Sequence, residues 1–553
     1  MKVTIISLNS QYIHSSLAVW YLLSSAQKYC EGGIEVSVAE GTVNEDIEVL
    51  YKRFSALKSD VIAFSVYIWN VNTVLALSKM LSKNGVKIVV GGPEVSYCPE
   101  KILEENKWID FVLSGEGEKP ICSLLPALFK NSDFDGVEGL SYRNCKRFII
   151  GQPYITDSIP ESPYSEKYFS ALNGRIAYIE TSRGCPFSCA FCLSGRCGGV
   201  RYFPLERAKS DIIALANSGS KIIKFVDRTF NANEKRAYDI FSFIIENYGV
   251  SIPKDVCFHF EIAGDLLKSR DFELLKTAPK GAIQFEIGMQ SFNGETLKAV
   301  NRRTNVTRLK ENIKRLTELS NIHIHIDLIA GLPKEDYKSF RKSFNTAFFL
   351  NADMLQLGFL KLLHGADMRE KSGKYPCEFS SLPPYEVAST PWLNETELNM
   401  LHCCENALER FVNSGRFIKT NELIFGKQKR NPFDTLTELG MFTGSSSCPL
   451  NEYVDKLFWF FGRGSDFDAL RDALICDVAE SVKSNVLPKS LLVNDKRLRD
   501  FRHFLESDTK TRRKKGVMRN VFLLYGENCG AYVDYDQKID GKYQLHKIEF
   551  NLK

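Results

Sequence analysis

Short apolar segments alternate with amphipathic stretches over the first part of this chain, from residue 1 to about residue 145. Val19–Cys30 has the spacing of a helix. Five segments have the length and composition of strands: Val3–Ser7, Ile34–Val38, Val61–Val66, Val86–Val90 and Phe111–Leu113. This alternation predicts an α/β fold with a doubly wound, flavodoxin-like parallel sheet. Ligands on such sheets bind at the carboxyl ends of the strands, so the loops that follow the strands should line one edge.

A second series of strand–helix units runs from Arg175 to about Met368. Stretches with helical spacing of apolar residues separate its strands. The expected strands are Ile176–Glu180, Ile222–Asp227, Cys257–Ile262, Ile283–Met289, Ile322–Ile329 and Met354–Leu360. Such units predict an incomplete (β/α)6 barrel of TIM type, in which chemistry takes place at the carboxyl ends of the strands.

Two further segments complete the expected organisation. The first domain (1–145) and the barrel (173–370) are joined by a linker (146–172) that is rich in Pro, Ser and Tyr. Residues 371–553 are expected to form a mostly helical capping domain that selects the substrate. Its expected helices and closing strands are Glu395–Ser414, Asp466–Ser484, Val521–Leu524, Ala531–Asp534 and Gln544–Phe550.

Three cysteines lie directly after the first predicted strand of the barrel. Cys185, Cys189 and Cys192 have the spacing C-x3-C-x2-C within S-R-G-C-P-F-S-C-A-F-C-L-S-G-R-C. Thiolates this close in sequence can wrap a loop around one iron–sulfur cluster. Zinc is the alternative, but a closed zinc site takes a fourth ligand, and Cys197 is the only nearby candidate. Three thiolates on a cluster of four irons leave one iron open for chemistry.

The cysteine loop, with Phe191 before its last cysteine, resembles the signature loop of the radical S-adenosylmethionine (radical SAM) enzymes. The resemblance covers the whole barrel segment, through KFVDRTFNAN, HFEIAGDLL, FEIGMQSFNGETLKAVNRRT and HIDLIAGLPKED. It implies a [4Fe–4S] cluster on the three cysteines, with SAM on the open iron. Reductive cleavage of SAM then gives a 5′-deoxyadenosyl radical that removes a hydrogen atom from the substrate. A reductant such as flavodoxin or ferredoxin is implied as a partner.

The same resemblance assigns cofactor-binding residues. By motif position, Gln290 and Asp327 resemble the residues that hold the SAM ribose. Arg302 resembles the arginine that pairs with the methionine carboxylate, a role that suits a guanidinium. Asp227 resembles the groups near the methionine amino end, and Phe191 is counted with these residues.

Other polar residues share faces of the predicted strands, because residues two apart point to the same side. The candidates that could face substrate, as catalytic residues, are His259, Glu261, Glu286 and His325. For each polar residue the alternative is a structural hydrogen bond. His323 and His325 could also form a metal pair, although the sequence offers no evident third ligand.

The first domain resembles the cobalamin-binding domain that precedes many radical SAM barrels. SDVIAFSVYIWN, VVGGPEVSYCPE and DFVLSGEGE match its recurrent phrases in the expected order. The D-x-H-x-x-G motif, whose histidine coordinates cobalt in methionine synthase-type domains, is absent, and His14 is the only histidine here. Several relatives bind cobalamin without a histidine. Bound cobalamin and a domain that keeps the fold without the cofactor therefore both stay open.

Composition limits the partners and the compartment. A net charge of +5 over 553 residues does not by itself indicate nucleic acid or a membrane. The basic run Lys510–Lys515 could contact phosphate, but such runs are usually solvated loops. No apolar run approaches the length of a membrane span. Fifteen cysteines without a regular framework fit a reducing compartment, so we expect a cytoplasmic protein.

Three hypotheses for function follow. The layout resembles a radical SAM subfamily whose C-terminal region has no known function and which includes queuine lyase. This resemblance implies release of the queuine base from a queuosine nucleotide in salvage, with a small nucleoside or nucleotide substrate. The alternative is a cobalamin-dependent radical SAM methyltransferase. The non-enzyme alternative is a cobalamin- or redox-sensing regulator, in which the cluster only reports.

Overall fold

The computed structural model describes all residues except 31, 146, 463–465, 484–486, 508–519, 540 and 553. The basic run Lys510–Lys515 therefore lies outside the described residues. The chain divides into two compact units. The first comprises Met1–Asp336, Leu350–Asp353 and Phe359–Asn394, and the second comprises Tyr337–Phe349, Met354–Gly358 and Glu395–Lys553.

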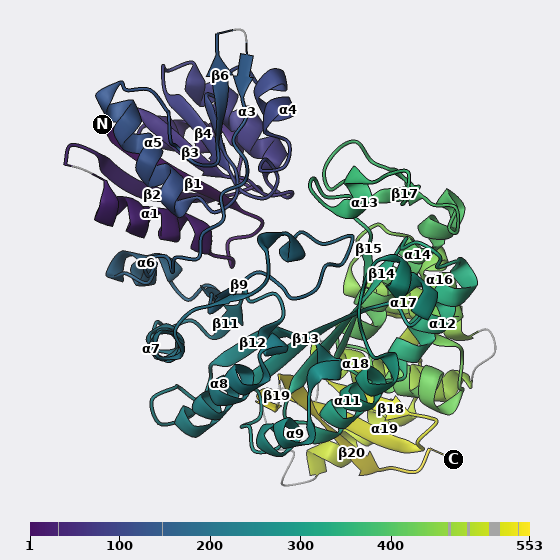
Figure 1. Ribbon diagram of the computed structural model, residues 1–553. Helices are drawn as coiled ribbons and strands as arrows, with labels where there is room; N and C mark the ends of the chain where they lie inside the picture. The colour runs from purple at the N-terminus through teal and green to yellow at the C-terminus, as the bar shows by residue number, and fades with distance from the viewer. Residues whose placement is uncertain are drawn as a thin grey trace. The chain divides into compact units, whose positions relative to one another are not determined.

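The first unit begins with a seven-stranded sheet of order β2-β1-β3-β4-β5-β6-β7 (Figure 1). Strands β1 to β5 pair in parallel, and β6 and β7 add an antiparallel hairpin at one edge. The bounds are β1 (Lys2–Asn9), β2 (Glu35–Thr42), β3 (Val61–Ser65), β4 (Lys87–Gly91), β5 (Phe111–Leu113), β6 (Leu140–Asn144) and β7 (Arg147–Ile149). The predicted flavodoxin-like sheet is confirmed. The sequence pattern does not predict the hairpin, because its residues are largely polar.

Helices cover both faces of this sheet. Their bounds are α1 (Leu17–Tyr29), α2 (Ile47–Ser55), α3 (Val71–Ser82), α4 (Pro99–Glu105) and α5 (Glu118–Lys130). Apolar residues of α2, α3 and α4 share one core with the strands, whereas α1 and α5 lie together on the other face (Figure 1). All residues of β3 are buried, as expected for a parallel strand covered on both faces.

A six-stranded sheet of order β15-β14-β13-β12-β11-β8 follows. Neighbouring strands from β8 to β14 are parallel. The bounds are β8 (Ala177–Ile179), β11 (Ile222–Phe225), β12 (Cys257–Ile262), β13 (Ile283–Gln290), β14 (His323–Ala330) and β15 (Met354–Phe359). Within the described residues β8 and β15 do not pair with each other, so the barrel is incomplete, as predicted.

Helices between these strands cover the outer face of the barrel. They are α7 (Leu205–Ala216), α8 (Glu234–Asn247), α9 (Ser269–Leu275), α10 (Gly294–Ala299), α11 (Val306–Leu319) and α12 (Tyr337–Phe348). Burial alternates along β13, with apolar side chains fully buried and Gln284, Glu286 and Gln290 partly exposed. Phe260 of β12 is fully buried and packs against Phe225 and Phe285. One face of each strand thus packs in the apolar core, and the polar residues lie on the opposite face.

The segment between the two sheets is more structured than the linker predicted from its composition. It contains α6 (Glu166–Leu172), whose Tyr168 is fully buried. At its start the backbone of Tyr154 pairs with the loop after β5: Tyr154 N–H donates to Ser114 O, and Glu116 N–H donates to Tyr154 O. Gly115 has a φ of 89°, and a side chain there would collide with Tyr154. This close approach ties the segment to the first sheet.

The second unit is mainly helical, with a small sheet at its end. Its helices are α14 (Glu395–Ala407), α15 (Ile418–Asn421), α16 (Pro432–Thr443), α17 (Leu450–Gly462), α18 (Phe467–Ser481) and α19 (Arg497–Ser507). Strands β18 (Val521–Leu524), β19 (Cys529–Ile539) and β20 (Lys542–Glu549) form an antiparallel sheet. The predicted fold class, with a mostly helical C-terminal region and a few strands, is confirmed. Among the described helices none is long and apolar enough to span a bilayer.

Candidate functional site

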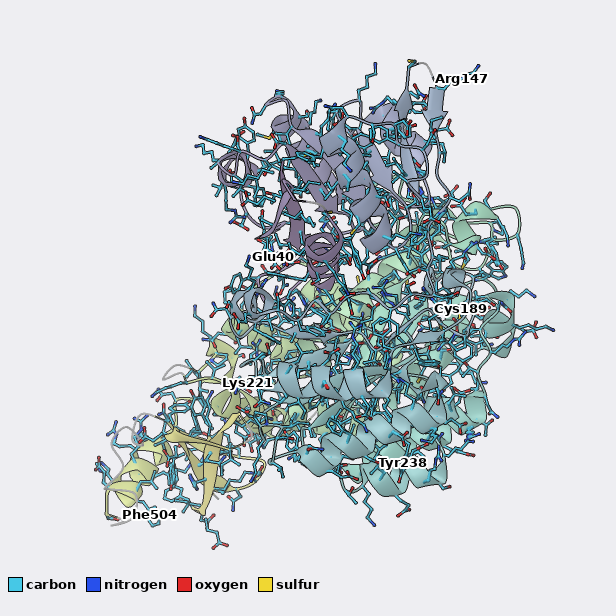
Figure 2. All side chains as sticks on the ribbon, turned by 60° about the vertical axis from the view of Figure 1, so that its left-hand side comes forward. Glu40, Arg147, Cys189, Lys221, Tyr238 and Phe504 are labelled. Atoms are coloured by element: carbon cyan, nitrogen blue, oxygen red, sulfur yellow. The ribbon has the colours of Figure 1, made fainter. Side chains whose placement is uncertain are left out.

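The three cysteines of the C-x3-C-x2-C motif share one loop of the first unit. The loop follows β9 (Ser182–Arg183) and is followed by a short helix at Ser194–Cys197. Cys189, labelled in Figure 2, is buried, and Cys185 and Cys192 are half-buried. Burial raises the pKa of the Cys189 thiol, and the charges of Cys192 and Cys185 add to this rise. The three thiols are therefore close enough to affect one another's ionisation.

Each thiol has a polar neighbour. Arg302 Nη1 lies 3.8 Å from the sulfur of Cys189, and the backbone N–H of Ser194 donates to the sulfur of Cys192 at 3.4 Å. The hydroxyl of Thr229 lies 3.3 Å from the sulfur of Cys185. Donors of this kind stabilise thiolates, which are the form that binds iron. The surroundings of the loop thus fit an anionic metal cluster.

A single metal ion fits the loop less well. Within the described residues, no three His, Cys, Asp or Glu side chains converge so as to hold one ion. Zinc at about 2.3 Å from each sulfur would require such convergence. A cluster with four irons instead takes each thiolate on a different iron, so its ligands lie further apart. The cysteines fit the predicted [4Fe–4S] cluster, and the described part of the chain offers no third ligand beside His323 and His325.

Asp227 anchors the start of the cysteine loop. Its Oδ2 accepts a hydrogen bond from Thr181 N–H at 2.9 Å, and its Oδ1 accepts from the hydroxyls of Thr181 at 2.7 Å and Ser182 at 2.5 Å. Burial raises the pKa of this carboxyl, and these hydrogen bonds oppose the rise. Contact with the methionine end of SAM stays a prediction, because these hydrogen bonds join the carboxylate to Thr181 and Ser182.

Gln290 and Arg302 lie together beside the cysteine loop. Gln290 ends β13 at a register shift and has a φ of 68°, which is uncommon for a residue with a side chain. A Cβ at Gly288 would collide with the Gln290 amide, so a glycine is needed there. Arg302 Nη2 donates to Gly288 O. Gln290 Oε1 and Arg302 Nε are buried without a hydrogen-bond partner. Such orphaned groups fit a polar ligand, as the predicted SAM contacts require.

A row of ionisable side chains crosses the inner face of the barrel. Lys224 of β11 stands opposite Tyr178 of β8 and His259 of β12 in the strand register. Lys224 Nζ lies 3.1 Å from Glu286 Oε2, and His259 Nε2 lies 2.9 Å from the same oxygen. Burial raises the pKa of Glu286, but His259 and Lys224 more than offset this and lower it to about 2. Glu286 is therefore held as a carboxylate between the side chains of Lys224 and His259.

A second row lies one step further along the strands. Glu261 stands opposite Glu286, and Glu286 stands opposite His325 of β14. His325 Nε2 lies 3.1 Å from Asp327 Oδ1. Burial lowers the pKa of His325, but hydrogen bonding and charge from Asp327 outweigh this effect and raise it. Burial raises the pKa of Glu261. Proton donors and acceptors thus lie side by side on one surface.

The structure brings the predicted substrate-facing residues together, but their roles stay predictions. His259, Glu261, Glu286 and His325 all belong to this inner face, and Asp327 adjoins it. Phe191 is half-buried in the cysteine loop. Sequence reasoning missed Lys224, although a lysine among apolar residues of a predicted strand is a usable signal.

Arg183 joins the cysteine loop to the first sheet. Its guanidinium contacts three carboxylates: Glu116 at 3.2 Å, Glu118 at 2.5 Å and Glu180 at 3.0 Å. Glu116 also pairs with Arg201 of β10 (Arg201–Tyr202). Arg183 is 13% exposed, so these pairs are largely shielded from water. Glu116 and Glu118 follow β5, and the network therefore links the edge of the first sheet to the residues just before Cys185.

The carboxyl edge of the first sheet carries groups that fit a large amide-bearing cofactor. The buried hydroxyl of Ser114, at the end of β5, has no hydrogen-bond partner. After β3, Trp69 is 50% exposed and stacks on Tyr67 with ring centroids 4.3 Å apart. His14 does not present a free Nδ1, because this atom lies 2.7 Å from the hydroxyl of Tyr178. A cobalamin at this edge would be held by loops and not by the missing motif histidine.

Three family models match successive parts of the chain. The B12 binding domain matches residues 3–125, the radical SAM superfamily matches 179–347, and a protein of unknown function (DUF4080) matches 373–522. The fold and the cysteine loop agree with these assignments. Residues 179–347 therefore match a radical SAM domain, and residues 3–125 before them match a B12-binding domain. The C-terminal part of the chain carries the DUF4080 region, and the radical SAM domain implies a [4Fe–4S] cluster and SAM as cofactors.

Curated relatives share part of the chain. An uncharacterized methyltransferase, PH0819, of Pyrococcus horikoshii is 35% identical over 43% of this chain and 53% of its own length. The cobalamin-dependent radical SAM methyltransferase TokK of Streptomyces tokunonensis is 28% identical over 52% of this chain and 44% of its own. The chain thus spans about half the length of these relatives.

Solved structures share the fold. OxsB, a cobalamin-dependent S-adenosylmethionine radical enzyme with aqua-cobalamin and S-adenosylmethionine bound, matches with a TM-score of 0.60. The match has 14% identity and covers 86% of this chain and 78% of OxsB. The radical S-adenosylmethionine methyltransferase TsrM from Kitasatospora setae matches with a TM-score of 0.57 and 16% identity, over 67% of this chain and 74% of TsrM.

Proposed function

We propose that this protein is a radical SAM enzyme that acts on a polar small molecule inside the barrel. The observation that carries the proposal is the row of ionisable groups around Glu286, on the inner face of the strands that also position Gln290 and Asp327. The cluster with SAM, when bound, supplies a 5′-deoxyadenosyl radical that removes a hydrogen atom from the substrate. An apolar substrate would shield these ionisable groups from water without offering them hydrogen bonds, which is unfavourable.

Different residues of the chain bind the cluster, bind SAM and contact the substrate in this proposal. Cys185, Cys189 and Cys192 hold the cluster, Arg302 and Gln290 orient SAM through polar atoms that lack partners, and Asp327 contacts its ribose. Glu286 accepts hydrogen bonds from substrate N–H or O–H groups. His325, kept charged by Asp327, donates a hydrogen bond or a proton. Glu261, whose pKa is raised by burial, can hold a proton for transfer.

For the overall reaction, we favour transfer of a methyl group from cobalamin to carbon. The match to the B12 binding domain, the names of the two relatives above and the groups at the edge of the first sheet support this choice. Cobalamin, when bound, supplies the methyl group. Ser114, Trp69 and the glycines after β4 would hold it at the edge of the sheet.

Queuine lyase is the second candidate. Residues 373–522 match a region of unknown function. The resemblance to queuine lyase depends on a domain layout that ends in such a region. The engaged His14 and the missing D-x-H-x-x-G motif are compatible with a first domain that has lost its cofactor. In this reaction, hydrogen abstraction from the sugar leads to cleavage of the base–ribose bond.

One anaerobic experiment separates the candidates. The reconstituted protein is incubated with SAM, dithionite and methylcobalamin, and with candidate substrates that include queuosine nucleotides. Formation of 5′-deoxyadenosine with S-adenosylhomocysteine and a methylated product supports the methyltransferase. Free queuine with 5′-deoxyadenosine, formed without cobalamin, supports the lyase. Absence of 5′-deoxyadenosine under all conditions would contradict radical chemistry and favour the regulator.

A further inference from the structure

The cysteine loop reaches the surface beside the turn that follows α10. Pro186 and Ser188, between the first two cysteines, are exposed. Asn301 Nδ2 donates to Ser188 O at 2.9 Å and to its hydroxyl at 2.5 Å, and Ala190 N–H donates to Val300 O at 2.9 Å. These bonds hold the loop and the turn together, so the turn presents a surface that adjoins the cluster ligands.

This surface is hollowed and basic. A groove of ≈ 350 Å³ runs along it, with Lys298, Asn301, Arg302 and Arg303 among its lining residues. The segment from Gly294 to Arg315 contains seven Lys or Arg residues and two Glu residues. Its excess of five positive charges equals the net charge of the whole chain, +5. Positive charge is therefore dense along this segment.

The exposed cations of the groove are not neutralised by ion pairs with described residues. Lys298 and Arg303 are exposed, and neither makes an ion pair with a described residue. Glu295, the acidic residue of α10, already lies 3.8 Å from Lys334. Unpaired rim cations steer an oppositely charged partner and set the salt dependence of its binding.

We propose that the groove beside α10 is the docking surface for an acidic one-electron carrier protein, a small flavin or iron–sulfur protein. The inference rests on the proposed radical function, which needs one electron per cleaved SAM. In the step it serves, the carrier is oxidised by one electron and the cluster is reduced by one, without a proton or a leaving group. Docking at a surface that adjoins the cysteine loop keeps the transfer path short, and the charges of the groove match an acidic partner.

The test is the double variant Lys298→Glu/Arg303→Glu in the full-length, anaerobically purified protein. The matched control is Lys52→Glu/Lys83→Glu, which makes the same change of charge at exposed lysines of α2 and at the end of α3. The binding of oxidised flavodoxin, an acidic flavin protein, is measured by calorimetry at several salt concentrations. We expect the Kd to rise about tenfold or more in the groove variant and to stay within about twofold in the control. In the wild type it should rise with salt.

Reduction of the cluster by dithionite distinguishes a failure of the docking proposal from a failure of the proposed function. It needs no docking surface, so the groove variant should keep its iron content and its dithionite-reduced EPR signal. Unchanged flavodoxin affinity in the groove variant, with cluster reduction by dithionite intact, would overturn the docking proposal alone. A wild type whose cluster dithionite cannot reduce would overturn the proposed function. In a competition experiment, transfer RNA is added at the same concentration as flavodoxin. Displacement of flavodoxin from the groove would also overturn the assignment, because it would identify a nucleic-acid surface.

Discussion

Lys224 Nζ lies 3.1 Å from Glu286 Oε2, although the two residues belong to strands β11 and β13, which are not neighbours. His259, on the strand between them, contacts the same oxygen at 2.9 Å. The carboxylate thus joins three strands across the inner face of the barrel. This shared oxygen makes Glu286 the centre of the candidate substrate site, because changing it removes the shared partner of Lys224 and His259.

Replacement of Glu286 by Gln should remove substrate turnover and leave SAM cleavage in the absence of substrate. The unpaired Lys224 and His259 should lower the free energy of unfolding by about 1–3 kcal/mol. Product formation, 5′-deoxyadenosine and denaturant unfolding measure the three effects. The control Glu311→Gln, at an exposed site, should change stability by no more than about 0.5 kcal/mol. Full turnover by the Glu286 variant would exclude it from the substrate site.

Replacement of Cys189 by Ala should abolish the cluster. The other two thiolates cannot hold it alone, so iron content, visible absorbance and 5′-deoxyadenosine production should all be lost. Cys403→Ala, in the second unit, is the matched control and should keep the iron of the wild type. Zinc in place of iron in the anaerobic wild-type protein would contradict the assignment.

Replacement of Arg183 by Met should destabilise the first unit. It leaves Glu116, Glu118 and Glu180 without their shared guanidinium, and loss of one partner from such a shielded group costs about 3–5 kcal/mol. Thermal and denaturant unfolding measure the loss. Arg183→Lys should recover part of it, because the charge is kept. In the control Arg53→Met, the exposed pair with Glu45 should contribute at most about 1 kcal/mol. Equal effects of the two methionine variants would argue against the network.

His325 predicts a pH dependence of stability. Its pKa is raised in the folded protein, since Asp327 and Glu286 outweigh burial and the opposing charge of Lys224. The protonated form is therefore favoured by folding. Its contribution is full below a pH of about 6.5, the usual pKa of histidine, and is lost as the pH rises through the folded-state pKa.

Denaturant unfolding between about pH 6 and 9 should show this loss in the wild type, and Asp327→Asn should reduce it by removing the ion pair. Asp336→Asn, at an exposed position, is the control. Identical pH profiles for wild type and Asp327→Asn would show that the ion pair does not set the pKa of His325.

Local pattern was sufficient to predict most strands of the two parallel sheets and the chemistry of the cysteine loop. Val521–Leu524 and Cys257–Ile262 have in the structure the bounds that their apolar runs predict, because strand formation depends on neighbouring residues. The spacing of Cys185, Cys189 and Cys192 is likewise contained in one short segment. Residues on one strand, such as Glu286 and Gln290, could be assigned to one face by alternation alone.

What the sequence by itself determined, then, was the order of strands and helices, the two α/β folds and the three-cysteine loop, all of which depend on short-range spacing. The tertiary structure alone decided that Lys224 meets Glu286, that Arg183 gathers carboxylates from the first sheet, and that Asp227 holds Thr181 and Ser182. Apart from Arg183 and Glu180, which are close in sequence, the residues in these contacts are 45 to 67 positions apart. Only the strand register and the packing of the two sheets bring such residues within hydrogen-bonding distance.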